Sequence, residues 1–431
     1  MRYLLFLLFV LRLGNNDSFS QSKDTLIREL TIDFEIRPRA EYRDNFRWTV
    51  ADSIVPRLYT TGRNSLSINY RSNSLRLHAS PQEIRILGEP GVFSKVGGVN
   101  FFELYAEPKI TRYLSARVGR QALSLDNGRI FSAAPWSQQS RAHEGVRLFY
   151  KRKVETDLTV AFTRPYGKHF DPAYSPVSSH AYKLLFVHHL KYKFKNNLAL
   201  TTINTVDVCK RTNGNMRYYD RITTGGRIEY TRGQFYGTVN AYYQYGENAA
   251  SKKISAYYIQ PEISANTGST VLRLGAELLS GDKITASKQI SHSFVPLYGV
   301  AWKFMGNMNL FTRFPADVNE KGLINPYLFV IQQLSSNLSL RSDAHLFYSQ
   351  YPLLREGTEV KGKYLGFEND LSLNYKPVRG LEVIFGYSFS IAEKRMELFN
   401  KVKDAGKIPV WSYLMISYTP RLLGLRRKIK K

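Results

Sequence analysis

The sequence predicts an all-β protein, a transmembrane antiparallel β-barrel of about 18 strands with long external loops and short periplasmic turns. Three observations predict it. Most segments after Leu30 alternate apolar and polar residues with period two, as strands with one apolar face do. No apolar stretch beyond the N-terminus is long enough to cross a bilayer as a helix. Long polar links alternate with tight turns, as in an outer-membrane meander.

The N-terminus has the features of a secretory leader. Arg2 supplies a positive charge, a short apolar core follows it, and the small residues Ser18 and Ser20 precede the expected cleavage point. We therefore expect a signal peptide at 1–20 and a single outer-membrane β-barrel domain at 21–431. Export without a later stop signal places the protein in the outer membrane of a Gram-negative bacterium.

The alternation also predicts which side chains face lipid and which face the lumen. The apolar face of the first segment consists of Leu30, Ile32, Phe34 and Ile36. Its opposite face consists of Asp33, Glu35, Arg37 and Arg39. A barrel with a wet interior turns the apolar face outward and the charged face inward.

We expect the strands near 30–43, 62–70, 74–88, 99–110, 113–122, 143–152, 154–164, 178–194, 197–208, 217–232, 234–247, 252–264, 268–281, 323–334, 337–350, 362–376, 381–393 and 408–420. Of the links between them, only 248–251 is short where a long one is due. The longest links, 123–142 and 282–322, are expected to constrict or gate the mouth of the barrel. An even number of strands places both termini in the periplasm.

Composition agrees with a membrane wall and indicates an anionic partner. Aromatic residues make up 13% of the chain, with 29 Tyr and 25 Phe, as expected for aromatic girdles at two membrane interfaces. The formal net charge is +26, which attracts nucleic acid, lipopolysaccharide or an anionic solute. Nucleic acid conflicts with export and with the meander. Outer-membrane lipid, lipopolysaccharide and an anionic saccharide or small anionic solute remain as partners.

Basic residues predicted on the lumen side or in the adjoining loops are the candidate pore-lining and anion-binding residues. They are Arg37, Arg39, Arg117, Arg120, Arg129, Arg141, Arg147, Arg227 and Arg273. Five of them surround the link at 123–142 and are expected to form part of a selectivity patch. Arg120 is the exception, because it lies on the same strand face as Val118 and would therefore point outward unless a β-bulge turns it inward. The alternative is that these charges pair with acidic residues on neighbouring strands.

Catalysis and metal binding find little support. Cys209 is the one cysteine, so an intramolecular disulfide or a cysteine-based metal cluster is excluded. His188 and His189 are adjacent in a predicted strand and therefore point to opposite faces, and the other histidines show no ligand spacing. Asp171 and His169 share a polar loop in which such pairs arise by chance. We expect no enzymatic activity, no metal site and no cofactor.

Several motifs give the chain a family resemblance. They are Gly119-Arg120-Gln121, Asp126-Asn127-Gly128-Arg129, Trp136, and the run from Arg141 to Leu148. This pattern resembles the alginate-export family of outer-membrane porins. The C-terminal half is similar to a divergent branch of that family in Arg273–Glu277, Phe294–Gly299, Tyr364–Gly366 and Trp411–Tyr413. The resemblance implies an eighteen-stranded barrel whose arginine-rich pore passes anionic polysaccharide or related solutes.

Two features depart from the family pattern. Gly145 and Val146 stand before Arg147, where the family more often has two alanines. The chain also continues past Tyr418 into a basic tail instead of ending on an aromatic residue.

We interpret the chain as an outer-membrane channel for passive diffusion or export of anionic solutes, with a periplasmic secretion partner left open. The alternative is a barrel with a closed lumen that acts as an adhesin or as a loop-bearing surface enzyme. A substrate-gated transporter energised from the inner membrane is disfavoured, because the sequence shows no plug before the first strand.

Overall fold

The computed structural model describes residues 26–44, 46, 58–88, 99–163, 182–194, 197–211, 218–283, 289–311, 313–355, 358–398 and 406–429. The predicted signal peptide lies outside these residues. The helical segments described are α2 (Trp302–Met305), η3 (Ala316–Val318) and η4 (Lys394–Leu398). A search of the described helices found none with the length and apolar character needed to cross a membrane.

The long strands are β1 (Leu26–Asp44), β2 (Leu58–Ser72), β3 (Leu75–Ile86), β4 (Val99–Pro108), β5 (Leu114–Gln121), β6 (His143–Lys151), β7 (Val154–Phe162), β8 (Tyr182–Lys193), β9 (Leu198–Lys210), β10 (Tyr218–Arg232), β11 (Phe235–Glu247), β12 (Lys253–Asn266), β13 (Thr270–Leu279), β15 (Leu323–Ser335), β16 (Leu338–Ser349), β19 (Tyr364–Tyr375), β20 (Leu381–Ala392), β21 (Val410–Tyr418) and β22 (Arg421–Ile429). Three short strands are β14 (Ile290–Ser291), β17 (Leu354–Arg355) and β18 (Thr358–Glu359).

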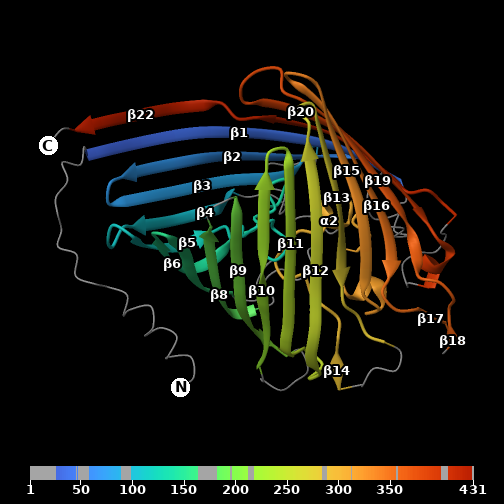
Figure 1. Ribbon diagram of the computed structural model, residues 1–431. Helices are drawn as coiled ribbons and strands as arrows, with labels where there is room; N and C mark the ends of the chain where they lie inside the picture. Colours follow the sequence, from blue (N-terminus) through green and yellow to red (C-terminus); the bar gives the residue numbers. More distant parts are fainter. Residues whose placement is uncertain are drawn as a thin grey trace.

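The long strands form one closed antiparallel barrel (Figure 1). From β1 to β21 each long strand pairs with the next in chain order, and β13 pairs with β15 and β16 with β19 across the intervening segments. Both β21 and β22 pair with β1, which closes the ring and makes the two the successive halves of one wall strand. The wall therefore has 18 strands, as predicted.

Every predicted strand interval coincides with one observed wall strand, and the alternation of long and short connections is confirmed. The main correction concerns the expected basic tail. Residues 421–429 are not a tail, because they form β22 and pair with β1 from Leu26 to Asp33. Pro420 separates β21 from β22, since proline has no N–H to donate to the ladder. Its carbonyl still accepts the Phe34 N–H at 3.1 Å, so the seam continues across the break.

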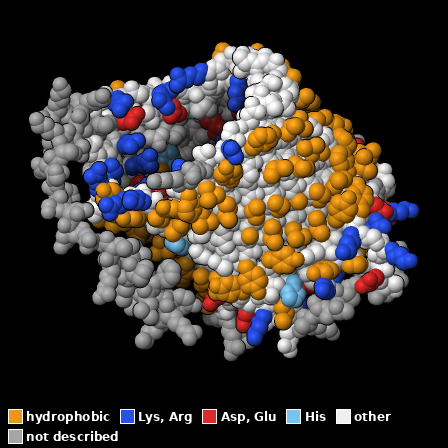
Figure 2. All heavy atoms as spheres, in the orientation of Figure 1, with side chains coloured by type: hydrophobic (Ala, Val, Ile, Leu, Met, Phe, Trp, Pro, Cys, Tyr) orange, Lys and Arg blue, Asp and Glu red, His pale blue; other side chains and the backbone are white. Residues whose placement is uncertain are grey.

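The two faces of the wall differ as the alternation predicted. In β1, Ile36 is 43% exposed whereas its neighbour Arg37 is 5% exposed. In β8, Leu184 and Phe186 are exposed, and Leu185 between them is fully buried. Figure 2 shows apolar side chains spread over the outer surface, with Lys, Arg, Asp and Glu gathered around a hollow beside them. A lipid-facing wall has this distribution.

Candidate functional site in the barrel interior

The link between β5 and β6, residues 122–142, folds into the barrel and reaches opposite walls. We call it the first inner loop. Near its start, Asp126 Oδ1 lies 3.1 Å from His189 Nε2 of β8. Near its end, the Ser137 carbonyl accepts a hydrogen bond of 2.6 Å from Arg37 of β1. Because β1 and β8 are far apart around the ring, the loop crosses the lumen.

Part of the link between β13 and β15, residues 280–322, also lies inside the barrel, whereas its short strand β14 pairs with the first residues of β12 at the end of the wall. We call this link the second inner loop. The Val295 N–H donates to Gln244 Oε1 of β11 at 3.0 Å. The Met308 N–H donates to Glu368 Oε1 of β19 at 2.7 Å. This loop therefore contacts a different part of the wall from the first.

The two inner loops pack against each other and form what we call the loop partition. Phe131 pairs with Tyr298 in an isolated parallel bridge, and their rings lie 5.3 Å apart between centroids. Arg141 Nη1 donates to the carbonyls of Tyr298 and Gly299 at 3.1 and 2.5 Å. A Cβ at Gly299 would lie 1.8 Å from the Arg129 carbonyl, so this close approach requires glycine. The partition places a buried apolar cluster across the lumen.

Two of the predicted anion-binding residues, Arg129 and Arg141, hold this partition together. Arg129 Nε lies 2.8 Å from Glu277 Oε1 of β13, and both side chains are at most 1% exposed. Arg129 Nη1 also donates to the Val300 carbonyl at 3.2 Å. Burial lowers the pKa of Arg141 to about 10. A solute in the lumen does not reach the buried pair.

Arg37 and Arg39 fix the other end of the first inner loop. Besides Ser137, Arg37 is within 3.9 Å of Glu35. Arg39 Nε lies 2.8 Å from Glu41 Oε1, and its guanidinium stands 4.9 Å from the ring centroid of Trp136. Trp136 belongs to the loop, so this contact joins β1 to the partition.

The remaining inward arginines pair with carboxylates on the wall. The pairs are Arg117–Glu107 at 2.6 Å, Arg147–Asp157 at 2.8 Å, Arg227–Glu229 at 2.7 Å and Arg273–Glu262 at 2.8 Å. The alternative of charge pairing across neighbouring strands therefore describes three of these pairs, whereas Arg227 and Glu229 lie on the same strand, β10. Such pairing cancels much of the field that the arginines would otherwise create in the lumen.

The structure contradicts the pore-lining prediction for Arg120. It pairs in register with Glu144 and Leu104, and Leu104 is 46% exposed on the outer face. Arg120 Nη1 lies 3.0 Å from Glu144 Oε1, and both side chains are exposed. The physical reason is its parity with Val118, which is 52% exposed. The five arginines expected as one patch are thus divided among wall, partition and outer surface.

Arg341 and Lys303 are two of the inward cations that were not predicted. Arg341 of β16 pairs with Asp343 at 2.7 Å. Lys303 of α2 remains exposed, and its Nζ donates to the Asn127 carbonyl at 2.6 Å. The parity that placed Asp343 inward could have identified Arg341. Lys303 lies in a loop without periodicity, so no sequence signal identifies it.

Several positive charges lie near Lys303 in the lumen. Its pKa is lowered to about 8, first by desolvation and then by the positive charges of Arg273, Arg227 and Arg341, while Glu262 opposes them. We call the four basic residues, Lys303, Arg227, Arg273 and Arg341, the cationic cluster. They come from the second inner loop, β10, β13 and β16, so the fold brings together what the sequence separates.

No metal centre is evident in the part of the chain that the structure describes. Its His, Cys, Asp and Glu side chains form no group of three or more that could hold an ion. His188 and His189 point to opposite faces of β8, as expected. Cys209 is buried.

Comparison with known proteins supports the fold. No family model matches the chain, and no curated protein matches it either. Pseudomonas aeruginosa OpdL has a similar solved structure, with a TM-score of 0.62, 13% identity, and coverage of 91% of this chain and 99% of that one. The P. aeruginosa outer membrane protein OpdK has a TM-score of 0.61 and 13% identity, with coverage of 91% of this chain and 99% of that one. P. aeruginosa OprD has a TM-score of 0.61 and 12% identity, with coverage of 92% of this chain and 96% of that one.

These likenesses extend over almost the whole barrel, and at such low identity they establish the fold alone. The comparisons do not support the resemblance to the alginate-export family. The chain has the 18-strand barrel fold of OpdL, OpdK and OprD, an architecture that fits the Gram-negative outer membrane.

Proposed function

We propose that this protein is an outer-membrane channel through which small anionic solutes diffuse passively. The closed wall, with its apolar outer face and charged inner face, supplies a water-accessible route through lipid. The observation that supports the anion preference is the placement of the exposed Lys303 amine near Arg273, Arg227 and Arg341, three guanidinium groups from three different strands. The proposal assigns no enzymatic activity.

The loop partition favours small solutes over a polymer. It fills much of the lumen with buried side chains, so an extended polysaccharide would have to displace it. OpdK, which shares the fold, has been crystallised with vanillate, an aromatic carboxylate. We therefore favour small carboxylates as solutes over the anionic polysaccharide that the alginate-export resemblance implied. Lipid and lipopolysaccharide surround the wall in this proposal, and no described feature favours a periplasmic secretion partner.

A second candidate, the closed barrel, is favoured by one observation. The inner loops contact β1, β8, β11 and β19, so they connect several sides of the wall. If no continuous path passes them, the protein would serve through its external loops instead of conducting.

Conductance in planar bilayers separates the candidates. For the purified protein under a KCl gradient we expect stepwise openings and a reversal potential that shows chloride permeating better than potassium. A potassium-selective channel would contradict the anion proposal. The matched variant lacks residues 300–311, the part of the second inner loop that contains Lys303 of the cationic cluster. Silence of the intact protein, together with conductance of this variant, would establish the closed barrel instead.

Blocking experiments address the solute. Vanillate, a uronate monosaccharide and a neutral sugar of similar size are each added to the side of the short turns. We expect the two carboxylates to reduce the chloride current at millimolar concentration and the neutral sugar to leave it unchanged. Equal block by all three would show that size, and not charge, decides entry.

A further inference from the structure

Two buried carboxylates differ from the others in the described part of the chain. Glu368 and Asp370 of β19 are 0% and 4% exposed, and neither forms an ion pair with a described Lys, Arg or His. Two adjacent negative charges that are buried without a counter-charge are costly. The remaining buried carboxylates each lie 2.6–2.8 Å from an arginine nitrogen, and they are Glu41, Asp157, Asp207, Glu262 and Glu277.

The neighbouring strand β16 does not balance these two charges. Asp343 pairs in register with Asp370 and is itself a carboxylate, to which the guanidinium of Arg341 bonds at 2.7 Å. His345 is the register partner of Glu368, and its Nδ1 lies 3.1 Å from a side-chain oxygen of β15. The described side chains of β16 therefore pair with other groups and leave the two carboxylates of β19 uncompensated.

Each of the two carboxylates uses one oxygen to hold the second inner loop. Glu368 Oε1 accepts the Met308 N–H at 2.7 Å, and Asp370 Oδ2 accepts the Asn307 N–H at 3.0 Å. A Cβ at Gly306 would overlap Glu368 Oε1, so glycine allows the loop backbone to come this close. The second oxygen of each carboxylate, Oε2 of Glu368 and Oδ1 of Asp370, is buried and has no hydrogen-bond partner in the described structure.

Two serine hydroxyls of β20 lie beside these free oxygens. Ser388 pairs in register with Asp370, and Ser390 pairs with Glu368. The serines are 1% and 0% exposed, whereas Ile391, which follows Ser390, is 48% exposed on the lipid side. Since side chains of a strand alternate, both hydroxyls point inward with the carboxylates. Their Oγ atoms also have no hydrogen-bond partner among the described residues.

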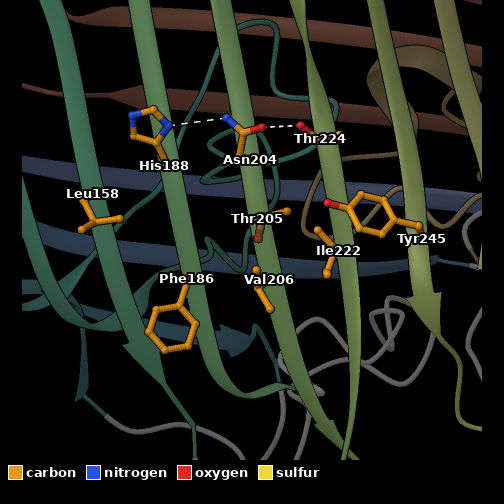
Figure 3. Close-up of a pocket in the computed structure, with 9 residues that line it drawn as sticks. All are labelled: Leu158, Phe186, His188, Asn204, Thr205, Val206, Ile222, Thr224 and Tyr245. Atoms are coloured by element: carbon orange, nitrogen blue, oxygen red, sulfur yellow. Dashed lines mark hydrogen bonds between the residues drawn. The ribbon is translucent and has the colours of Figure 1, made fainter. Parts of the chain in front are cut away.

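Polar side chains on other strands of the wall satisfy one another. On the outer face, Asn204 Nδ2 lies 3.4 Å from His188 Nδ1, and the Thr224 hydroxyl donates to Asn204 Oδ1 (Figure 3). On the inner face of β19 and β20, in contrast, four neighbouring oxygens are left without partners in the described structure. Carboxylate and hydroxyl oxygens of this kind are the ligands that a hard cation prefers.

We propose that Glu368, Asp370, Ser388 and Ser390 bind a calcium ion where the second inner loop meets the wall. Two carboxylates match the charge of the ion. Its oxygen ligands lie about 2.3–2.6 Å from it, so two of them stand up to about 5 Å apart. Directly opposed residues of an antiparallel pair have Cβ atoms about 4.5–5.5 Å apart, which suits that spacing. The group contains only two carboxylates, so it differs from the sets of three or more His, Cys, Asp and Glu considered above.

Calcium fits the group better than a shared proton or magnesium does. Glu368 and Asp370 are close enough to share one proton, but that proton would neutralise one of the two charges and leave the serine hydroxyls unpaired. Magnesium usually keeps several waters in a near-octahedral shell. Side chains that are 0–4% exposed leave little room for such waters.

The ion would also restrict the second inner loop. Its two carboxylate ligands hold the backbone of Asn307 and Met308, and α2, which carries Lys303, ends directly before Gly306. Bound calcium therefore limits the movement of the loop segment next to the cationic cluster.

Calorimetric titration tests the proposal on the full chain, washed with a chelator and refolded in detergent without lipopolysaccharide. With CaCl₂ we expect one ion to bind per chain. Glu368→Gln/Asp370→Asn removes both charges and keeps carbonyl oxygens that accept the loop N–H groups, and we expect it to lose binding. Glu144→Gln, which removes an exposed carboxylate from the outer face, is the matched control and should retain binding. Absence of binding to the parent, or equal binding by the double variant, would overturn the proposal.

A second measurement uses stability instead of heat of binding. A ligand that binds the folded state raises the midpoint of thermal unfolding. We expect CaCl₂ to raise the midpoint of the parent and to leave that of Glu368→Gln/Asp370→Asn unchanged, with heat-modified migration on gels showing that the variant is folded. An unchanged midpoint of the parent would contradict the proposal, and a larger shift with MgCl₂ than with CaCl₂ would overturn the assignment of calcium. Neither result depends on whether the barrel conducts.

Discussion

Arg129–Glu277 and Arg117–Glu107 are similar ion pairs in different surroundings. Both join an arginine to a glutamate, at 2.8 and 2.6 Å. The first is sealed within the partition, with side chains 1% and 0% exposed, and the second faces the lumen, with 14% and 16% exposed. The difference is access to water, which decides how much each pair contributes to stability and how much each can influence a passing ion.

The largest effect is expected from breaking the sealed pair. Glu277→Ala leaves the guanidinium of Arg129 buried without its carboxylate, and a cation in that position costs about 3–5 kcal/mol. We expect a correspondingly lower free energy of unfolding, measured by urea titration of the folded barrel in detergent. The double variant Arg129→Met/Glu277→Leu removes both charges and should recover most of the loss. If the single and double variants were equally unstable, loss of packing would be the cause.

A smaller effect, on selectivity instead of stability, is expected at Lys303. One unit charge about 4 Å from an ion in water changes its energy by about 1 kcal/mol, or roughly fivefold in a permeability ratio. Lys303→Gln should lower the chloride-to-potassium ratio by up to that factor, and Lys303→Glu by more. Arg120→Gln is the matched control, because it removes a cation from the outer face. An equal change in Arg120→Gln would exclude a local effect of the cationic cluster.

The same residue predicts a pH dependence. With a pKa of about 8, the Lys303 amine is charged below that pH and neutral above it. The contribution of Lys303 to anion selectivity should therefore be fully present below about pH 7 and decline as the pH rises through 8 toward about 9. Reversal potentials measured across this range give the midpoint. In Lys303→Gln this decline of selectivity with pH should disappear. If the decline persisted in the variant, another titratable group would be its cause.

The smallest effect is expected at the water-facing pair. Glu107→Gln removes one charge from a partly exposed pair, which contributes about 0–1 kcal/mol to stability. We expect the urea midpoint to shift little and the chloride-to-potassium ratio to rise slightly, because Arg117 loses its counter-charge. A loss of stability as large as that of Glu277→Ala would show that the two pairs do not differ as their exposure implies.

The wall was predictable from the sequence because successive side chains of a strand alternate between the lipid-facing and the lumen-facing side. That period alone placed Arg37, Arg117 and Arg147 inward, and the same parity cast doubt on Arg120 before the structure placed it outside. The strand beyond Pro420 was missed, because proline and a run of basic residues have the composition of a tail.

The interior was not predictable in the same way. Loop residues carry no period, so nothing in the sequence indicates that Arg129 meets Glu277 or that Lys303 meets Arg273 and Arg341. These contacts depend on how the two inner loops fold against each other. The hydrogen bonds that join His188, Asn204 and Thr224 across the outer wall were hidden for a different reason. His188, Asn204 and Thr224 lie on three strands, and the register that aligns them is a property of the assembled sheet.

The first inner loop also has a mechanical consequence. Its two ends are attached by Asp126 to β8 and by Ser137 to β1, so a single covalent segment fixes the distance between remote parts of the wall. A barrel with an empty lumen can flatten without breaking the hydrogen bonds between its strands. In this barrel, flattening would first have to break the contacts of the first inner loop with β8 or β1. We therefore expect lateral pressure in the bilayer to act on the partition through this segment, and a change in the cross-section of the barrel to move the residues that narrow it.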